Sequence, residues 1–317
     1  MIKVAIAGGS GDLAHHVVDA LLERNHEVVI LSRRDPKPDD LIEGITWLKV
    51  NYLDKNDLVK ALQGVHTVIS FILAHLDTKA EAQINLIDAC INAGVKRHAP
   101  SEWLGPNLSL SPFYASKLIV RAYLDEINKD KKVLEYTRFQ PGLFLDYLAS
   151  PYRTAKHITP ATTVIDFEHR RGLVADGVTH DAITYTAVRD IAAVVARAVE
   201  YEGEWPRIGG IRGNTVSAAQ LVALGEKIRG GKFEIAKEQL EDLNTFTIKN
   251  TAFVPPINHP SLSKDEIAIA SLSFSVVTLL TGAVRGWSVS DEWNRLLPDY
   301  KFAEIGAFLT EAWAGKP

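Results

Sequence analysis

Six short runs rich in β-branched and other apolar residues mark the first 145 residues of the chain. They predict strands at residues 2–7, 27–31, 45–50, 65–73, 95–100 and 133–139. Between these runs, apolar residues at helical spacing predict helices at residues 13–24, 56–63, 79–93 and 116–127. Strands that alternate with helices need crossover connections and pair in parallel. The pattern therefore predicts an α/β fold with a doubly wound parallel sheet.

This alternation ends after Gly142, where prolines begin to separate shorter elements. Helices are predicted there at residues 190–200, 218–229 and 302–314. We expect one domain over residues 1–150 and a smaller α/β substrate lobe over residues 151–317. Interleaving of lobe elements with the first domain remains open.

The bulk composition narrows the function classes. The 317 residues are 46% hydrophobic and carry a net charge of −4, which disfavours nucleic-acid binding. Cys90 is the single cysteine, as is typical of a reducing compartment, so we expect a cytoplasmic protein. The apolar stretch at residues 267–280 is interrupted by serines and threonines, and no membrane span is expected.

A glycine-rich loop joins the first predicted strand to the first predicted helix. Residues 7–14 read Ala-Gly-Gly-Ser-Gly-Asp-Leu-Ala. Gly8 permits a tight turn, Gly9 adds no side chain, and Gly11 lets the backbone approach a pyrophosphate. Ala14 is small enough for close packing of the helix on the strand. In this strand–helix context the loop predicts a Rossmann-type dinucleotide site.

The residues after the second predicted strand indicate which dinucleotide binds. Arg33 and Arg34 lie there, and two guanidinium groups match a 2′-phosphate by bidentate hydrogen bonds. Asp35 follows and offers the alternative of an acid for the ribose hydroxyls, as in NAD-binding sites. The arginine pair favours NADPH as the cofactor.

Several segments of the first 150 residues resemble a known family. They are the glycine loop, Asp54 after the third strand, residues 61–65 and 68–71, Pro100-Ser101-Glu102-Trp103, the helix around Lys117, and residues 137–147. In these motifs the chain resembles the NmrA-like, isoflavone-reductase-like group of atypical short-chain dehydrogenases/reductases. Trp103 and Leu104 depart from the Phe-Gly that the family usually has at this point.

The resemblance implies cofactor contacts along the carboxyl edge of the sheet. Besides the three glycines and the arginine pair, these are Ser10, Asp12, Leu13, Asp54, Ser70, Phe71, Lys117, Pro141 and Gly142. It also implies a C-terminal substrate lobe, in agreement with the pattern of elements.

The resemblance places the catalytic lysine at Lys117, whose ammonium would hold the nicotinamide ribose and polarise or protonate a substrate oxygen. The alternative is a surface lysine on an amphipathic helix. Short-chain dehydrogenases add a tyrosine four residues before the lysine and a serine after the fifth strand. Tyr114 precedes Lys117 by three residues and Ser101 follows the fifth strand, so both are secondary catalytic candidates. Tyr152 and Lys156 have the spacing of four but follow the sixth strand, which excludes them as the catalytic pair.

Substrate contacts are expected from loops at the carboxyl ends of the strands. The predicted contacts are His75, Trp103, Phe144, Tyr147 and Tyr152. Aromatic rings at these positions favour a planar apolar ligand. The histidines lack ligand spacing, so no metal site is expected.

These features favour an NADPH-dependent reductase of a small aromatic or unsaturated carbonyl compound, with a place in secondary metabolism. We expect it to work as a monomer or homodimer. One alternative is a regulatory protein of the NmrA type that senses NADP and catalyses nothing. Another is a non-redox enzyme on the same fold. Lys117 favours the enzyme, because a sensor does not need it.

Overall fold

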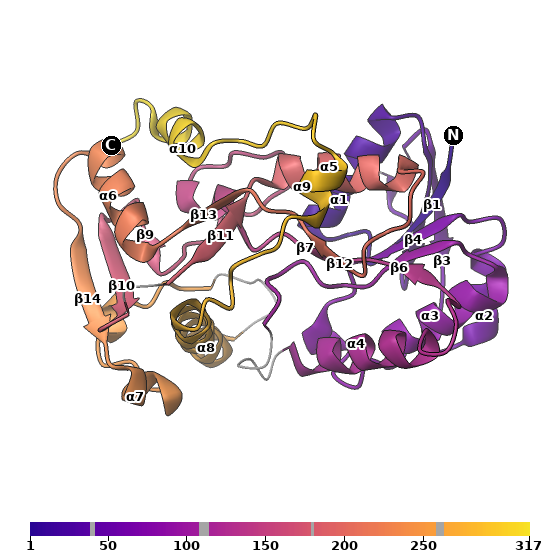
Figure 1. The fold of residues 1–317 in the computed structure, drawn as a ribbon, viewed down its shortest axis with the longest axis horizontal. Helices are drawn as coiled ribbons and strands as arrows, with labels where there is room; N and C mark the ends of the chain where they lie inside the picture. The colour runs from indigo at the N-terminus through magenta and orange to yellow at the C-terminus, as the bar shows by residue number, and fades with distance from the viewer. Residues whose placement is uncertain (39–41, 108–113, 179–180, 258–262) are drawn as a thin grey trace.

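Six parallel strands form the central sheet of the computed structural model, in the order β3-β2-β1-β4-β5-β6 (Figure 1). The structure describes residues 1–38, 42–107, 114–178, 181–257 and 263–317. The strands are β1 (Lys3–Ala7), β2 (Glu27–Ser32), β3 (Ile45–Lys49), β4 (Thr67–Ser70), β5 (Arg97–Ala99) and β6 (Glu135–Tyr136). The winding reverses between β1 and β4, and doubly wound sheets bind their ligands at that point.

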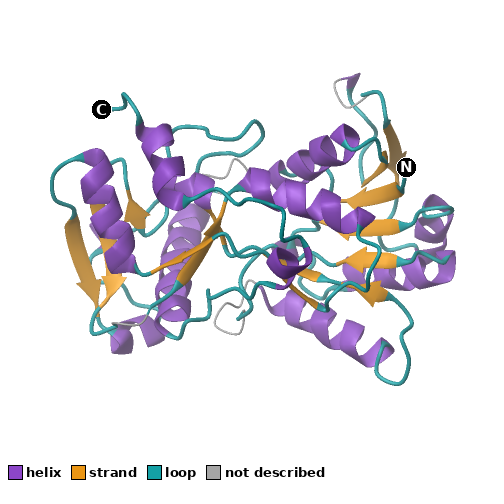
Figure 2. Ribbon diagram, turned by 45° about the horizontal axis from the view of Figure 1, so that its top comes forward, coloured by secondary structure: helices purple, strands orange, loops and turns teal. Residues whose placement is uncertain are grey.

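Helices cover both faces of this sheet (Figure 2). One face carries α1 (Asp12–Glu23) and α5 (Val188–Glu200), whose apolar residues share one core with β1 and β2. The other face carries α2 (Lys55–Ala61), α3 (Glu81–Ala93) and α4 (Ala115–Ile127) around a second core. Helix α5 comes from the second half of the chain but packs on the central sheet. A boundary at residue 150 therefore does not divide the chain into two independently packed domains. The lobe elements are interleaved with the first domain.

The sixth strand differs from the prediction over residues 133–139. It is divided into β6, which joins the main sheet, and β7 (Arg138–Gln140), which pairs with β12 (Ile208–Gly210). This second partner approaches the chain closely, since a Cβ on Gly209 would lie 2.3 Å from Thr137 Oγ1 and 3.2 Å from the Arg138 carbonyl oxygen. It lies about 70 residues further along the chain.

The lobe is built from two small sheets and short helices around a third core. One sheet has the order β14-β10-β9 and the other β13-β11-β8. The strands are β8 (Leu143–Phe144), β9 (Ile165–Asp166), β10 (Arg171–Ala175), β11 (Ile183–Thr186), β13 (Asn214–Val216) and β14 (Glu234–Glu238). The helices are α6 (Ala218–Arg229), α7 (Leu240–Asn244), α8 (Lys264–Ala283), α9 (Glu292–Leu296) and α10 (Ile305–Trp313), with 3-10 turns η4 (Leu145–Ala149) and η5 (Thr251–Phe253). A further 3-10 turn, η2 (Ala74–Leu76), follows β4 of the central sheet.

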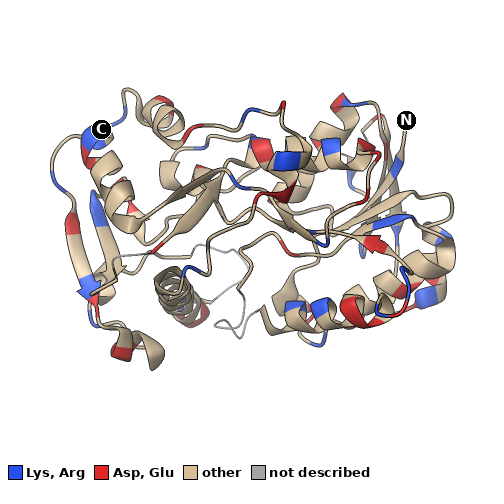
Figure 3. Cartoon of the chain, in the orientation of Figure 1, with Lys and Arg blue, Asp and Glu red and all other residues tan. Residues whose placement is uncertain are grey.

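Helix α8 is the longest apolar element of the lobe. Its charges lie in the first turn (Figure 3), and within the described residues it is the one helix long and apolar enough to cross a membrane. Of its most apolar window, 56% is buried inside the protein. The Ser275 hydroxyl donates within the helix to the Ser271 carbonyl at 2.9 Å, and the Ser271 hydroxyl accepts the Ile257 N–H at 2.8 Å. Its apolar half packs into the lobe core.

Candidate functional site

A cleft of about 1500 Å³ opens at the carboxyl ends of β1, β2 and β4 and reaches the lobe. The glycine loop, residues 8–12, forms part of its wall. Gly8 has a φ of +74°, and a Cβ there would lie 2.9 Å from the Phe71 carbonyl carbon. A Cβ on Gly9 would lie 2.9 Å from the Ile30 side chain. Gly11 caps α1 without a side-chain bond, so the first N–H groups of the helix can receive an anion.

Two side chains hold this loop in place. The Tyr52 hydroxyl accepts the Gly8 N–H at 3.3 Å and donates to the Leu31 carbonyl at 2.9 Å. Burial raises the pKa of Tyr52, so the hydroxyl stays neutral. The Asp12 carboxylate accepts the backbone N–H of Thr159 at 2.7 Å, which ties the loop to the lobe. Tyr52 was not predicted from the sequence, because only the register of β2 and β3 brings it beneath the loop.

At the end of β2, Arg33 and Arg34 line the cleft, and Arg33 is exposed. The alternative residue, Asp35, pairs with Lys49 at 2.6 Å. The hydrogen bond from Lys49 lowers the pKa of Asp35. This geometry assigns Asp35 to an ion pair and leaves the cleft wall to the two arginines.

The other predicted cofactor residues fall into two groups. Ser10 and Phe71 line the cleft, whereas Leu13 is buried under α1. Asp54 caps α2 by accepting the N–H groups of residues 56 and 57, and Ser70 is buried against Gln83. Pro141 and Gly142 lie where the chain enters the lobe: the Pro141 carbonyl accepts the Thr186 hydroxyl at 2.7 Å, and a Cβ on Gly142 would lie 2.2 Å from the Thr184 carbonyl oxygen. Five of the predicted contacts, Leu13, Asp54, Ser70, Pro141 and Gly142, thus have packing, capping or hydrogen-bond partners in the structure.

Lys117 is a buried lysine on α4, 6% exposed, rather than a surface residue. Its Nζ donates to the carbonyls of Ser101 at 2.5 Å and Glu102 at 2.9 Å. Burial lowers the pKa of Lys117 to about 8, against the opposing effect of the Glu102 charge. Glu102 is 1% exposed and receives Nε and Nη2 of Arg121 at 3.0 and 2.5 Å. The Glu102–Arg121 ion pair fixes the loop whose carbonyl groups accept the hydrogen bonds of Lys117.

The two secondary candidates lie beside Lys117. Tyr114 directly precedes α4, and its ring centroid lies 5.8 Å from the Lys117 Nζ. Burial raises the pKa of Tyr114. Ser101 is buried, and its backbone N–H donates to Gln83 Oε1 at 2.9 Å. The structure therefore brings all three predicted catalytic residues together at the end of β5.

Of the five predicted substrate contacts, all in the described part of the chain, Tyr147 alone is among the residues that line the cleft. The Phe144 ring lies behind it at 5.2 Å, and His75 lies on the exposed turn η2. Trp103 is buried with a φ of +50° and stacks on Phe71 at 4.5 Å, so it supports the cleft floor from beneath. Tyr152 packs against Trp313 at 5.3 Å in the lobe core.

The lobe wall of the cleft was missed by sequence reasoning. It consists of Ser150, Pro151, residues 159–162, Asp166, Glu168, His169, Arg171, Pro256, Ile257 and Phe274. Asp166 accepts His169 Nδ1 at 2.8 Å and Arg171 Nε at 3.0 Å. The ligand atoms of Asp166, Glu168 and His169 lie within 4.8 Å of one another, and Arg171 Nε contacts the same Asp166 Oδ2 that His169 Nδ1 contacts. These residues form an amphipathic wall opposite the glycine loop.

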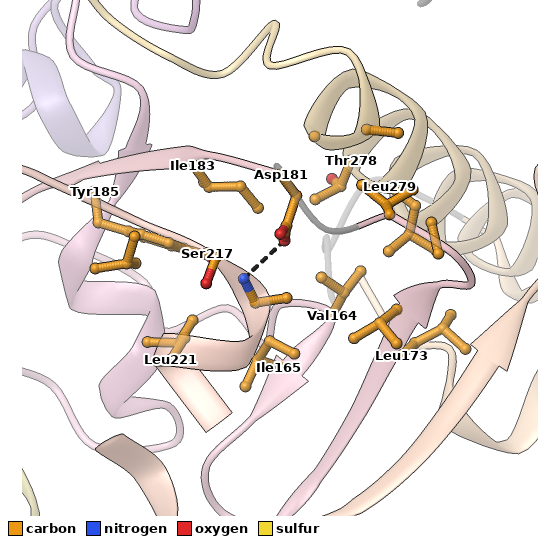
Figure 4. A pocket seen from close by; sticks show the side chains of 17 residues that line it. Val164, Ile165, Leu173, Asp181, Ile183, Tyr185, Ser217, Leu221, Thr278 and Leu279 are labelled. Carbon is orange, nitrogen blue, oxygen red and sulfur yellow. Dashed lines mark hydrogen bonds between the residues drawn. The ribbon is translucent and has the colours of Figure 1, made fainter. Parts of the chain in front are cut away.

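A second cavity lies inside the lobe, between α6, α8 and β11 (Figure 4). Its volume is about 30 Å³, which is the space of one water molecule. Leu173, Ile183 and Leu279 are among its apolar lining, and the Asp181 carboxylate beside it accepts the Ala218 N–H at 2.7 Å. It is too small for an organic substrate, which leaves the large cleft as the candidate site.

Comparisons with known proteins agree with this architecture. Oxidoreductase swnN of Metarhizium robertsii is 29% identical over 267 residues, which cover 76% of this chain and 77% of the relative. Phenylcoumaran benzylic ether reductase TP7 of Nicotiana tabacum is 26% identical and covers 97% of both chains. The solved NADPH complex of quinone oxidoreductase QOR2 from Escherichia coli superposes with a TM-score of 0.72 at 20% identity, over 98% of this chain and 99% of that one. Residues 2–273 match the profile of the NmrA-like family, and the chain belongs to that family.

Proposed function

We propose that this protein is an NADPH-dependent oxidoreductase that reduces a small aromatic or unsaturated carbonyl compound. The observation that carries the proposal is the single cleft that joins the glycine loop, Arg33 and Arg34 to the lobe wall. The loop fits a pyrophosphate, because Gly8 and Gly9 leave no room for side chains. Support also comes from relatives that are named oxidoreductase and from the NADPH complex of a structural neighbour.

In this proposal the cofactor supplies the hydride, and the chain supplies orientation and a proton. The Lys117 ammonium has three protons, and the carbonyls of Ser101 and Glu102 take two of them. Lys117 is not among the residues that line the cleft, so its third proton reaches the substrate oxygen through a water. A pKa of about 8 lets Lys117 release that proton near neutral pH. Phe71 and Tyr147 line the reacting region and limit its access to water.

A second candidate is a protein that senses NADP and catalyses nothing. The position of Lys117 favours it, because Nζ already has two backbone acceptors and the side chain is 6% exposed. In that case the lysine holds the 101–102 loop and acts on no substrate. A cytoplasmic location and a place in secondary metabolism remain predictions from the sequence.

One experiment separates the two candidates. NADPH oxidation is followed with a panel of quinones, aromatic aldehydes and α,β-unsaturated ketones, using the native chain, Lys117→Ala and Lys129→Ala. Lys129 is the matched control, a lysine just beyond α4 that is 64% exposed. We expect Lys117→Ala to lower kcat by about a hundredfold or more, and Lys129→Ala to leave turnover unchanged. Equal turnover in both variants contradicts the role of Lys117. NADPH binding without turnover on any compound favours the sensor, and absence of NADPH binding overturns both candidates.

A further inference from the structure

The end of β2, which carries Arg33 and Arg34, is held by the neighbouring strand β3. The two strands are parallel, with Ile30 opposite Trp47 and Ser32 opposite Lys49. Side chains two residues apart on a strand lie on the same face. Trp47 and Lys49 therefore point together toward the loop that follows β2. Neither residue belongs to the glycine loop or to the catalytic group.

Trp47 holds Arg34 at two points. Its indole ring lies under the guanidinium, with Cζ 4.6 Å from the ring centroid, and its Nε1 donates to the Arg34 carbonyl at 3.1 Å. The Ser32 hydroxyl accepts the Arg34 N–H at 3.2 Å. Backbone and head group are thus fixed together. The Arg34 guanidinium also donates through Nη1 to the Asp35 carbonyl at 3.0 Å. A guanidinium that is already held in one orientation loses less freedom when a ligand binds.

Lys49 acts on Asp35, the acid that would favour a dinucleotide without a 2′-phosphate. Its Nζ lies 2.6 Å from Asp35 Oδ2, and both side chains are exposed, so the pair adds little to stability. Its effect is on charge. An acid at this point favours ribose hydroxyls and repels a 2′-phosphate. The ammonium neutralises that acid and adds a positive charge beside the two arginines.

We propose that Trp47 and Lys49 are positioning residues that set the preference for a 2′-phosphorylated dinucleotide, Trp47 through Arg34 and Lys49 through Asp35. This inference rests on the dinucleotide binding of the proposed function and does not depend on catalysis. The chemistry recognised is a phosphomonoester dianion on the adenosine ribose.

Isothermal titration of NADPH and NADH onto the full chain tests the inference without a substrate. Trp47→Leu removes the ring, and Trp47→Phe keeps a ring but loses the N–H. We expect Trp47→Leu to weaken NADPH about fivefold and to leave NADH unchanged, with Trp47→Phe closer to the native chain. An equal loss for both nucleotides means a merely structural role and overturns the inference for Trp47.

Lys49→Met exposes the charge of Asp35. We expect the NADPH-to-NADH affinity ratio to fall about threefold or more, and Lys49→Met combined with Asp35→Asn to restore it. A ratio that Lys49→Met leaves unchanged, or that Asp35→Asn does not restore, overturns the role of Lys49. A native chain that binds neither nucleotide refutes the proposed function itself, whereas native NADPH preference with insensitive variants refutes only this inference.

Discussion

Two buried carboxylates each face an arginine, one beside the catalytic candidates on the dinucleotide side of the cleft and one in its lobe wall, but they are held differently. On the dinucleotide side, Glu102 receives two nitrogen donors from Arg121, a residue of helix α4. On the lobe side, Asp166 receives Arg171 and also the ring and backbone N–H of His169. The first carboxylate depends on one side chain from a regular element. The second has three donors from a single turn between β9 and β10.

The proposed function gives this difference a reason. A pyrophosphate can be bound by the backbone N–H groups of a fixed loop, where added side chains do not fit. Loops with polar side chains are suited to binding a substrate. The comparison predicts that single substitutions reduce ligand affinity or stability most on the dinucleotide side. They should reduce them least where several donors share one acceptor.

Gly8→Ala should have the largest effect. The new Cβ would lie 2.9 Å from the Phe71 carbonyl carbon at a φ of +74°, so the loop must move. We expect NADPH affinity to fall about a hundredfold or more, together with about 1–2 kcal/mol of stability from the left-handed backbone. Gly64→Ala is the matched control, since Gly64 also has a positive φ, +73°, but lies outside the loop and its Cβ would meet nothing within 4 Å. Calorimetric titration and thermal melts measure both, and native affinity in Gly8→Ala would falsify the assignment of the loop.

Arg121→Met should follow, with its main effect on stability. It leaves Glu102, 1% exposed, without its ion-pair partner. Removal of one member of a buried pair costs about 3–5 kcal/mol. Arg121→Lys should recover part of this loss. Chemical denaturation measures it, and a loss below about 1 kcal/mol would show that the pair is not the support of this loop.

Arg171→Met on the lobe wall should cost less, about 1–2 kcal/mol, because Asp166 keeps both donors of His169. The larger effect of Arg171→Met should be a higher KM for the substrate that NADPH reduces, because Arg171 lines the lobe end of the cleft. The affinity for NADPH should not change. A stability loss equal to that of Arg121→Met would remove the distinction between the walls.

The same distinction explains what the sequence could predict. The glycine loop directly follows β1 and Arg33 directly follows β2, so the local sequence pattern was enough to find them. The strands β1, β2, β4 and β5 are mostly buried runs and were predicted for the same reason, whereas β3 is half-exposed and was predicted from its apolar residues. The division of β6 and β7 was not predictable, since it depends on β12.

The errors in the site have the same physical cause. Trp103 was expected to contact substrate because it follows β5, yet its left-handed backbone turns the ring into a stack with Phe71. The lobe wall around Asp166 and Arg171 has no hydrophobic period, and only tertiary packing brings it to the cleft. Trp47 and Lys49 lie beside Arg34 and Asp35 only because of the β2–β3 register, which the sequence pattern does not show.

A strap, residues 153–160, connects the two walls. Its Thr159 N–H donates to Asp12, and its His157 N–H donates to His16 Nε2 at 3.1 Å. His16 must therefore carry the lone pair on Nε2, which a protonated imidazole lacks. The charged or titratable groups around it are Asp12, His15, Asp19, Asp146, Lys156 and His157. Protonation of His16 removes an acceptor that joins the strap to α1.

The smallest effect on stability and NADPH affinity should come from protonation of His16. Burial first, and then the neighbouring His157, lower the pKa of His16 from 6.5, so the unfolded chain binds the proton before the folded one. Stability and NADPH affinity should both be full above pH 6.5 and fall as the pH drops below it. His16→Gln keeps an acceptor and does not titrate, so the difference between native and variant chains isolates this proton from the other buried histidines. Melting temperatures and NADPH titrations at pH of about 7.5 and about 5.5 measure it. An identical acid loss in His16→Gln would show that the strap does not couple the two walls.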